Sequence, residues 1–201
     1  MAQVPVIKSW SEAKPYLENL ARTVEADVGP LLKTPDGAPF AINREVLSYV
    51  DHLGHLYTGE SAVGRRSRKY LAEVLSKVDQ NYGQRAAEIY EMYRCGSVHE
   101  FEPKLLRNKK GQSLGWLCYR GERQAQILID GQQVAVTHLE PVPSTTGALF
   151  WLPVSTVCLI DDLVASIEQF AQAGWASDRV AAWNRAAQDL STPVSFEFTI
   201  P

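Results

Sequence analysis

The chain lacks any apolar run that approaches the roughly 20 residues needed to span a membrane. Of its 201 residues, 45% are hydrophobic and 21% are charged, which is close to average globular usage. The first residues do not combine a charged segment with an apolar stretch, so we expect no secretory signal. These absences argue against an integral membrane protein and predict a soluble, cytoplasmic protein without a membrane partner.

Cysteine is scarce, and the three that occur, Cys95, Cys118 and Cys158, lie far apart in the chain. An odd number at such spacing fits neither a disulfide framework nor a zinc site. The sequence also lacks a Gly-x-Ser-x-Gly elbow, a Walker-type phosphate loop and a Gly-x-Gly-x-x-Gly fingerprint. Enzyme classes that depend on these motifs are therefore disfavoured, and we expect no cofactor.

Basic charge of the kind that attracts nucleic acid is also missing, because the formal net charge is −3. Any affinity for phosphates must therefore come from a local patch. One candidate patch is the run Arg65-Arg66-Ser67-Arg68-Lys69, which begins a predicted helix where cations oppose the helix dipole. Its cationic members are Arg65, Arg66, Arg68 and Lys69, and Arg94, Lys104, Arg107, Lys109 and Lys110 would extend it. The alternative is a solvated cluster that pairs with Glu60, Glu73 or Asp79.

Helical spacing of apolar residues dominates the first half of the chain. Turn signals at Gly29-Pro30 and Pro35-Asp36-Gly37 separate the first two predicted helices. Four helices are expected here. The first begins after Trp10-Ser11, and the second runs from about Asn43 to Gly59. The third carries Tyr70 to Val78, and the fourth extends from Tyr82-Gly83 to Cys95-Gly96.

Beyond Gly96 the hydrophobic period changes towards two, which is typical of strands. Asp130-Gly131 predicts a hairpin turn, because both positions need a positive φ. Helices are expected from Ser155 and from Ser177, and residues 194–200 alternate as a half-buried strand would. The sequence thus predicts an α+β fold in one domain of residues 1–201, with a helical bundle in residues 1–96. A small, mainly antiparallel sheet and two C-terminal helices make up residues 97–201.

Arg94 and His99 are five positions apart, with Gly96 between them at a predicted helix end. A guanidinium stays charged and fits a phosphate, whereas an imidazole can exchange a proton near neutral pH. Together the two groups could cleave RNA without a metal: His99 would activate the 2′-hydroxyl or protonate the leaving oxygen, and Arg94 would neutralise the transition state. In the alternative interpretation Arg94 caps its own helix end and His99 begins a strand.

The Arg94-to-His99 segment, with Cys95-Gly96-Ser97-Val98 between the pair, resembles the HEPN superfamily. Ribonucleases of that superfamily are helical bundles that use an Arg, four to six residues, and then a His. The resemblance covers residues 43–99 at most. It implies that Arg94 and His99 are catalytic, that the substrate is RNA and that the active site forms across a homodimer.

Other histidines and acids have simpler interpretations. His52 and His55 are close enough on a helix to share a metal, but no third ligand is evident, so we predict no metal site. Both lie off the apolar stripe and are expected to be exposed or at an interface. His138 is expected to be a hydrogen-bonded, partly buried residue rather than a ligand. Asp161 and Asp162 lie in the first turns of the helix expected from Ser155, and the helix dipole accounts for them.

Three functional hypotheses remain open at this point. The first is a non-catalytic binding or assembly module, since no complete set of catalytic residues is evident. Such a module could form a homodimer. The second is a metal-independent endoribonuclease that uses Arg94 and His99. The third is a regulator that binds phosphate or nucleic acid through the Arg65–Lys69 run.

Overall fold

The computed structural model describes residues 3–34, 38–95, 103–145, 147–172 and 177–192. It confirms the predicted α+β fold class. The helical elements are α1 (Trp10–Leu32), α2 (Pro39–Thr58), α3 (Val63–Glu73), the 3₁₀ turn η1 (Leu75–Lys77), α4 (Gln80–Ile89), the π-helix η2 (Tyr90–Cys95), α6 (Thr156–Gln172) and α7 (Ser177–Ser191). The strands are β1 (Leu106–Arg107), β2 (Ser113–Tyr119), β3 (Gln124–Ile129), β4 (Gln132–Thr137), β5 (Val142–Pro143) and β6 (Leu149–Ser155).

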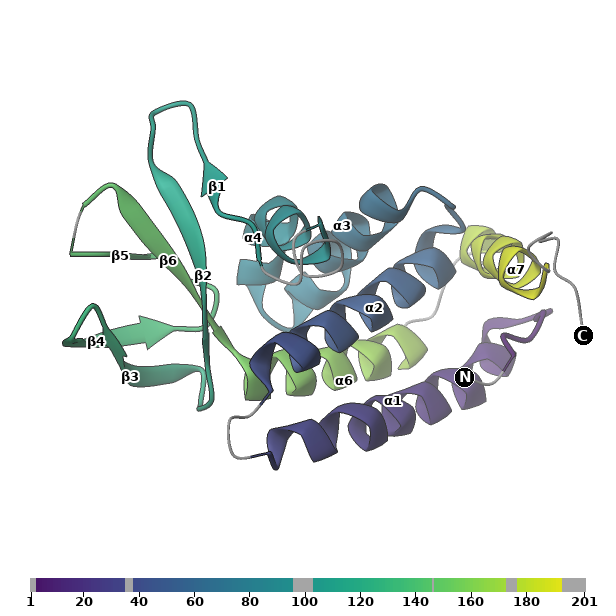
Figure 1. The fold of residues 1–201 in the computed structure, drawn as a ribbon. Coiled ribbons are helices and arrows are strands. Elements are labelled where there is room, and N and C mark those ends of the chain that lie inside the picture. Colours follow the sequence, from purple (N-terminus) through teal and green to yellow (C-terminus); the bar gives the residue numbers. More distant parts are fainter. Residues whose placement is uncertain (1–2, 35–37, 96–102, 146, 173–176, 193–201) are drawn as a thin grey trace, which may run out of the picture.

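The helices and the strands occupy different ends of the molecule (Figure 1). α1, α2 and α6 lie side by side, α3 packs on α2, and α4 packs on α3. The sheets lie at one end of this helical body, and α7 lies at the other. Among the helices that the structure describes, none combines the length and the apolar character that a membrane crossing requires.

One four-stranded sheet has the order β1-β2-β6-β5, and β3 and β4 form a separate hairpin. Three of the four pairings between the described strands are antiparallel, whereas β2 and β6 run parallel over seven residue pairs. The predicted hairpin turn is confirmed, since Asp130 has φ 51° and Gly131 has φ 80°. The parallel pair puts Tyr119 at the end of β2 beside Ser155, directly before α6.

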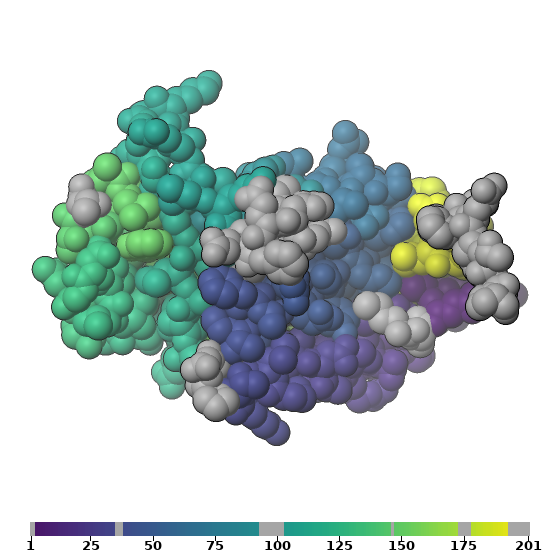
Figure 2. All heavy atoms as spheres, in the orientation of Figure 1, coloured from purple at the N-terminus to yellow at the C-terminus, as the bar shows by residue number. Residues whose placement is uncertain are grey.

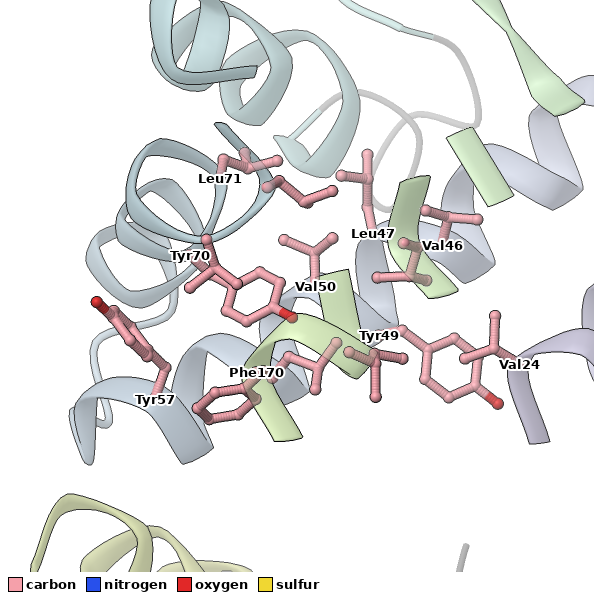
Figure 3. Close-up of a cluster of buried hydrophobic side chains, with 14 of the residues drawn as sticks. Val24, Val46, Leu47, Tyr49, Val50, Tyr57, Tyr70, Leu71 and Phe170 are labelled. Atoms are coloured by element: carbon pink, nitrogen blue, oxygen red, sulfur yellow. The ribbon is translucent and has the colours of Figure 1, made fainter. Parts of the chain in front are cut away.

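The main core lies between the helices (Figure 3). Tyr70 and Phe170 are almost completely buried there, with their ring centroids 6.0 Å apart. Trp183 of α7 is fully buried against Trp10 of α1, at 5.6 Å between ring centroids. Burial of each such side chain contributes about 1.5–3 kcal/mol, so this core holds the helices together.

Two helix boundaries show what local chemistry decided. α2 ends at Gly59 as predicted, and the φ of 65° there is a left-handed conformation that glycine adopts at little cost. α1, in contrast, continues through Gly29 and Pro30 to Leu32, so the predicted turn is wrong. Proline keeps a helical φ and removes only one donor near the helix end, while Val28 is fully buried. The predicted strand of residues 194–200 lies outside the described residues.

The N-terminal segment is attached to α7 by hydrogen bonds. Asn184 accepts from the Ile7 N–H and donates to the Ile7 carbonyl, each at 2.8 Å. The Trp183 indole donates to the Pro5 carbonyl, also at 2.8 Å. The two ends of the described chain are thus joined at the end of the helical body farthest from the sheets (Figure 1).

Candidate functional site

The predicted catalytic pair falls largely outside the described residues. The backbone of Arg94 belongs to η2, but its side chain and all of His99 lie beyond what the structure describes. The Lys104 N–H donates to the Met92 carbonyl at 2.9 Å, so the chain returns beside η2 after residues 96–102. Whether Arg94 and His99 converge stays a prediction.

Within the Arg65–Lys69 run, Arg66 is committed to an internal ion pair. Its Nε and Nη2 donate to the two carboxylate oxygens of Asp51 at 2.9 and 2.6 Å, and both side chains are only 13% exposed. The Ser67 hydroxyl also donates to Asp51, at 2.7 Å. Such a bidentate pair joins α3 to α2 and leaves Arg66 little capacity to bind a phosphate.

The other members of the run lie nearer to solvent. Arg65 is 3.6 Å from Glu60, one of the acids expected to pair with the run. Arg68 is 3.6 Å from Glu91, and its guanidinium carbon lies 5.2 Å from the centre of the Tyr90 ring. Lys69 is half-buried. These exposed ion pairs are weak, so Arg65 and Arg68 could exchange their partners for a ligand.

The other two acids expected near the run pair elsewhere. Glu73 accepts from the Tyr57 hydroxyl at 2.6 Å and lies 3.9 Å from Arg179 of α7. Asp79 caps α4, where it accepts from the Asn81 N–H at 2.9 Å, and forms an ion pair with Arg123. Neither carboxylate therefore neutralises the Arg65–Lys69 run.

His52 and His55 face different helices. His52 is hydrogen-bonded to the Tyr16 hydroxyl of α1 at 2.9 Å, whereas His55 contacts Asp189 of α7 at 3.2 Å. The expectation that both are exposed or at an interface is wrong for His55, which is 4% exposed because α7 covers it. Burial lowers the pKa of His52 to about 4, helped by repulsion from His55, and burial also lowers the pKa of His55. Within the described ranges no group of three or more ligating residues could hold a metal.

The densest polar cluster joins the helical body to the strands at Arg123, in the turn between β2 and β3. Arg123 forms ion pairs with Asp79 at the start of α4 and with Asp162 in α6, the latter at 2.6 Å. Asp162 is 5% exposed and also accepts from the Tyr82 hydroxyl at 3.0 Å. The helix dipole therefore accounts for only part of the role of Asp162.

His138 completes this cluster as the predicted hydrogen-bonded residue. Its Nδ1 accepts from the Ser155 N–H at 3.0 Å, and its Nε2 lies 3.1 Å from the Tyr82 hydroxyl. A neutral imidazole has one donor and one acceptor, so Nε2 carries the proton and donates to Tyr82. Burial, with a smaller contribution from the Arg123 charge, lowers the pKa of His138 to about 3. With its side chain fully buried and neutral, His138 stabilises the fold and cannot reach a substrate in this conformation.

An open groove of about 460 Å³ lies between α4 and the β1–β2 hairpin. Arg85 and Glu88 line it from α4, and Arg107 lines it from β1. Arg85 Nη1 is 3.4 Å from Glu88 Oε1, and both side chains are 31% exposed. Two guanidinium groups against one carboxylate make this groove cationic, although the whole chain is acidic.

The rest of the groove comes from the sheet. Gln112 and Ser113 supply an amide and a hydroxyl from the hairpin, and Phe150 of β6 supplies an aromatic ring. The hairpin itself projects from the body of the molecule in the space-filling view (Figure 2). An aromatic surface with a few polar groups around it is typical of a small-molecule site.

Sequence reasoning missed most of this groove. Arg107 was expected only as an extension of the Arg65–Lys69 run, and Arg85, Glu88 and Phe150 carried no motif. The one local signal is the spacing of Arg85 and Glu88, which puts them on the same face of a helix. No family model matches the sequence, and comparison with curated proteins and with solved structures returns no significant match.

Proposed function

We propose that the chain is a non-catalytic binding module that takes a phosphate-bearing ligand in the groove between α4 and the β1–β2 hairpin. The observation that carries this proposal is the arrival of Arg85 and Arg107 in one groove from two different elements. Guanidinium groups present planar sets of donors that match phosphate oxygens, and they remain charged at any physiological pH.

The other groups that line the groove favour a nucleotide as the ligand. Phe150 offers a ring on which a base can stack, and such stacking tolerates any base. Gln112 and Ser113 can exchange hydrogen bonds with base or sugar edges. The ligand is therefore a nucleotide, either free or within single-stranded RNA. Its phosphate binds in the groove and not at Arg66.

Replacing Arg107 or Arg85 by Ala should weaken nucleotide binding about tenfold each, since one charge-assisted hydrogen bond contributes roughly 1.5 kcal/mol. Titration calorimetry measures the affinity for adenosine 5′-monophosphate, and a fluorescence titration measures the affinity for a labelled single-stranded oligoribonucleotide. Arg22→Ala is the matched control, because Arg22 is an exposed cation on α1 and does not line the groove. The oligonucleotide affinity should also fall as salt rises. Wild-type affinity in Arg107→Ala, or no binding by the wild type, contradicts the proposal.

A second proposed function is the metal-independent ribonuclease that the HEPN resemblance implies. What favours it is that α4 lines the cationic groove and continues through η2 as far as Cys95, next to the predicted catalytic pair. RNA bound in the groove would then lie along the helix that leads to η2, and the HEPN resemblance implies that a homodimer would complete the site.

The ribonuclease proposal predicts that purified protein cleaves single-stranded RNA in the presence of a chelator. Arg94→Ala and His99→Ala should each abolish this cleavage, because one removes the charge that stabilises the transition state and the other the proton carrier. Gel analysis of a labelled oligoribonucleotide measures the cleavage, with Arg22→Ala again as the control. Equal absence of cleavage in the wild type and both variants refutes the enzyme.

A further inference from the structure

Glu88 is the one acidic side chain among the described residues that line the groove. It lies one helical turn from Arg85, and their closest approach, 3.4 Å from Nη1 to Oε1, is long for a charge-assisted hydrogen bond. With 31% of each side chain exposed, the pair is partly solvated. Such a pair contributes little to stability, so its geometry can change when a ligand enters.

A carboxylate in an anion-binding groove opposes the binding of a phosphate. Its presence beside two guanidinium groups therefore lowers affinity for phosphate alone and requires a compensating contact from the rest of the ligand. A carboxylate only accepts hydrogen bonds, so that contact must be a donor. The sugar of a ribonucleotide supplies such donors as two adjacent hydroxyls, 2′ and 3′, and the two oxygens of one carboxylate can accept from both, whereas a deoxyribonucleotide keeps only the 3′-hydroxyl.

We propose that Glu88 accepts a hydrogen bond from the ribose 2′-hydroxyl, so that the groove selects ribonucleotides over deoxyribonucleotides. This inference rests on the proposed function of the groove. A ligand without the 2′-hydroxyl places the Glu88 carboxylate next to the bound phosphate with one donor fewer to offset the repulsion. Sites that hold such a polar group reject the analogue that cannot satisfy it.

The selectivity can be measured first without any variant. Wild-type protein is titrated with adenosine 5′-monophosphate, with its 2′-deoxy analogue and with inorganic phosphate. We expect the ribonucleotide to bind about tenfold more tightly than the deoxyribonucleotide, as the loss of one hydrogen bond to a charged group predicts. Inorganic phosphate should bind more weakly than either nucleotide.

Glu88→Met then removes the acceptor while it keeps the length of the side chain. In this variant the two nucleotides should bind equally, and inorganic phosphate should bind more tightly than it does to the wild type. Glu91→Gln is the matched control, because Glu91 lies one helical turn after Glu88 but pairs with Arg68 of α3 and does not line the groove. It should leave the ribonucleotide preference unchanged.

The outcomes separate the two proposals. Equal binding of both nucleotides by the wild type, or a preference that survives in Glu88→Met, overturns the inference and leaves the binding function intact. Failure of both nucleotides to bind overturns the proposed function and the inference together. A tenfold preference that is lost only in Glu88→Met supports both.

Discussion

Arg123→Met should lower the free energy of unfolding by about 2 kcal/mol, less than the roughly 3–5 kcal/mol expected for a fully buried ion pair, because the Arg123 side chain is 39% exposed. Arg123 connects Asp79 at the start of α4 with Asp162 in α6, and Asp162 is 5% exposed. Without the guanidinium, the Asp162 carboxylate stays buried next to Tyr82 with no charge to balance it. Burial already raises the pKa of Asp162, and only Arg123 and the Tyr82 hydroxyl oppose that effect.

Urea unfolding at pH 7, followed by circular dichroism, measures this loss. The double variant Arg123→Met, Asp162→Asn should be less destabilised than the sum of the two single variants, because it leaves no unbalanced charge. Arg65→Ala, which removes an exposed cation 3.6 Å from its partner, should cost less than about 0.5 kcal/mol. A loss of that small size for Arg123→Met would show that the cluster does not join the two parts of the fold.

Acidification from pH 6.5 to pH 4.5 should lower the free energy of unfolding by about 1 kcal/mol per pH unit for each of His138 and His52. The pKa of His138 is about 3 and that of His52 about 4 in the fold, against an ordinary value of 6.5. Between these values the unfolded chain binds protons that the folded chain does not, so stability falls as pH falls. Near His138, Tyr82 stays neutral and Arg123 stays charged, whereas Asp162 has a raised pKa and therefore opposes the trend.

Chemical denaturation at a series of pH values tests this dependence. The glutamine of His138→Gln cannot titrate. The free energy of unfolding of this variant should therefore fall less steeply with pH than that of the wild type, by the contribution of one protonating group. His52→Gln should reduce this slope by a similar amount, which makes it the comparison variant. A wild-type free energy of unfolding that is constant from pH 6.5 to pH 4.5 contradicts the neutral, buried state of these histidines.

The elements that the sequence predicted well depend on residues close to one another in the chain. Gly59 ends α2, the Asp130-Gly131 turn joins β3 to β4, and the Ser155 hydroxyl accepts from the Cys158 N–H at 3.1 Å at the start of α6. In each case a φ angle or a capping hydrogen bond within three residues decides the outcome. Such preferences are similar in any fold, so they can be derived from the sequence alone.

The incorrect predictions concern residues whose partners are distant. His55 was expected to be accessible, but α7, which begins more than 100 residues later, buries it. Asp162 has a favourable helix position by itself, yet its partner Arg123 lies 39 residues earlier in a turn that carries no motif. The Gly29-Pro30 signal failed in the same way, because burial of Val28 outweighs a local turn preference.

By itself, the sequence determined the α+β class, the hairpin turn and most helix positions, since short-range sterics and hydrophobic period decide these. Only the tertiary structure decided that Arg66 forms an ion pair with Asp51 and that Arg123 joins the helices to the strands. It also decided that Arg85 and Arg107 line the same groove. Charge partners and cavities depend on which distant segments pack together. Packing follows from the summed burial of many side chains and leaves no pattern at any one position.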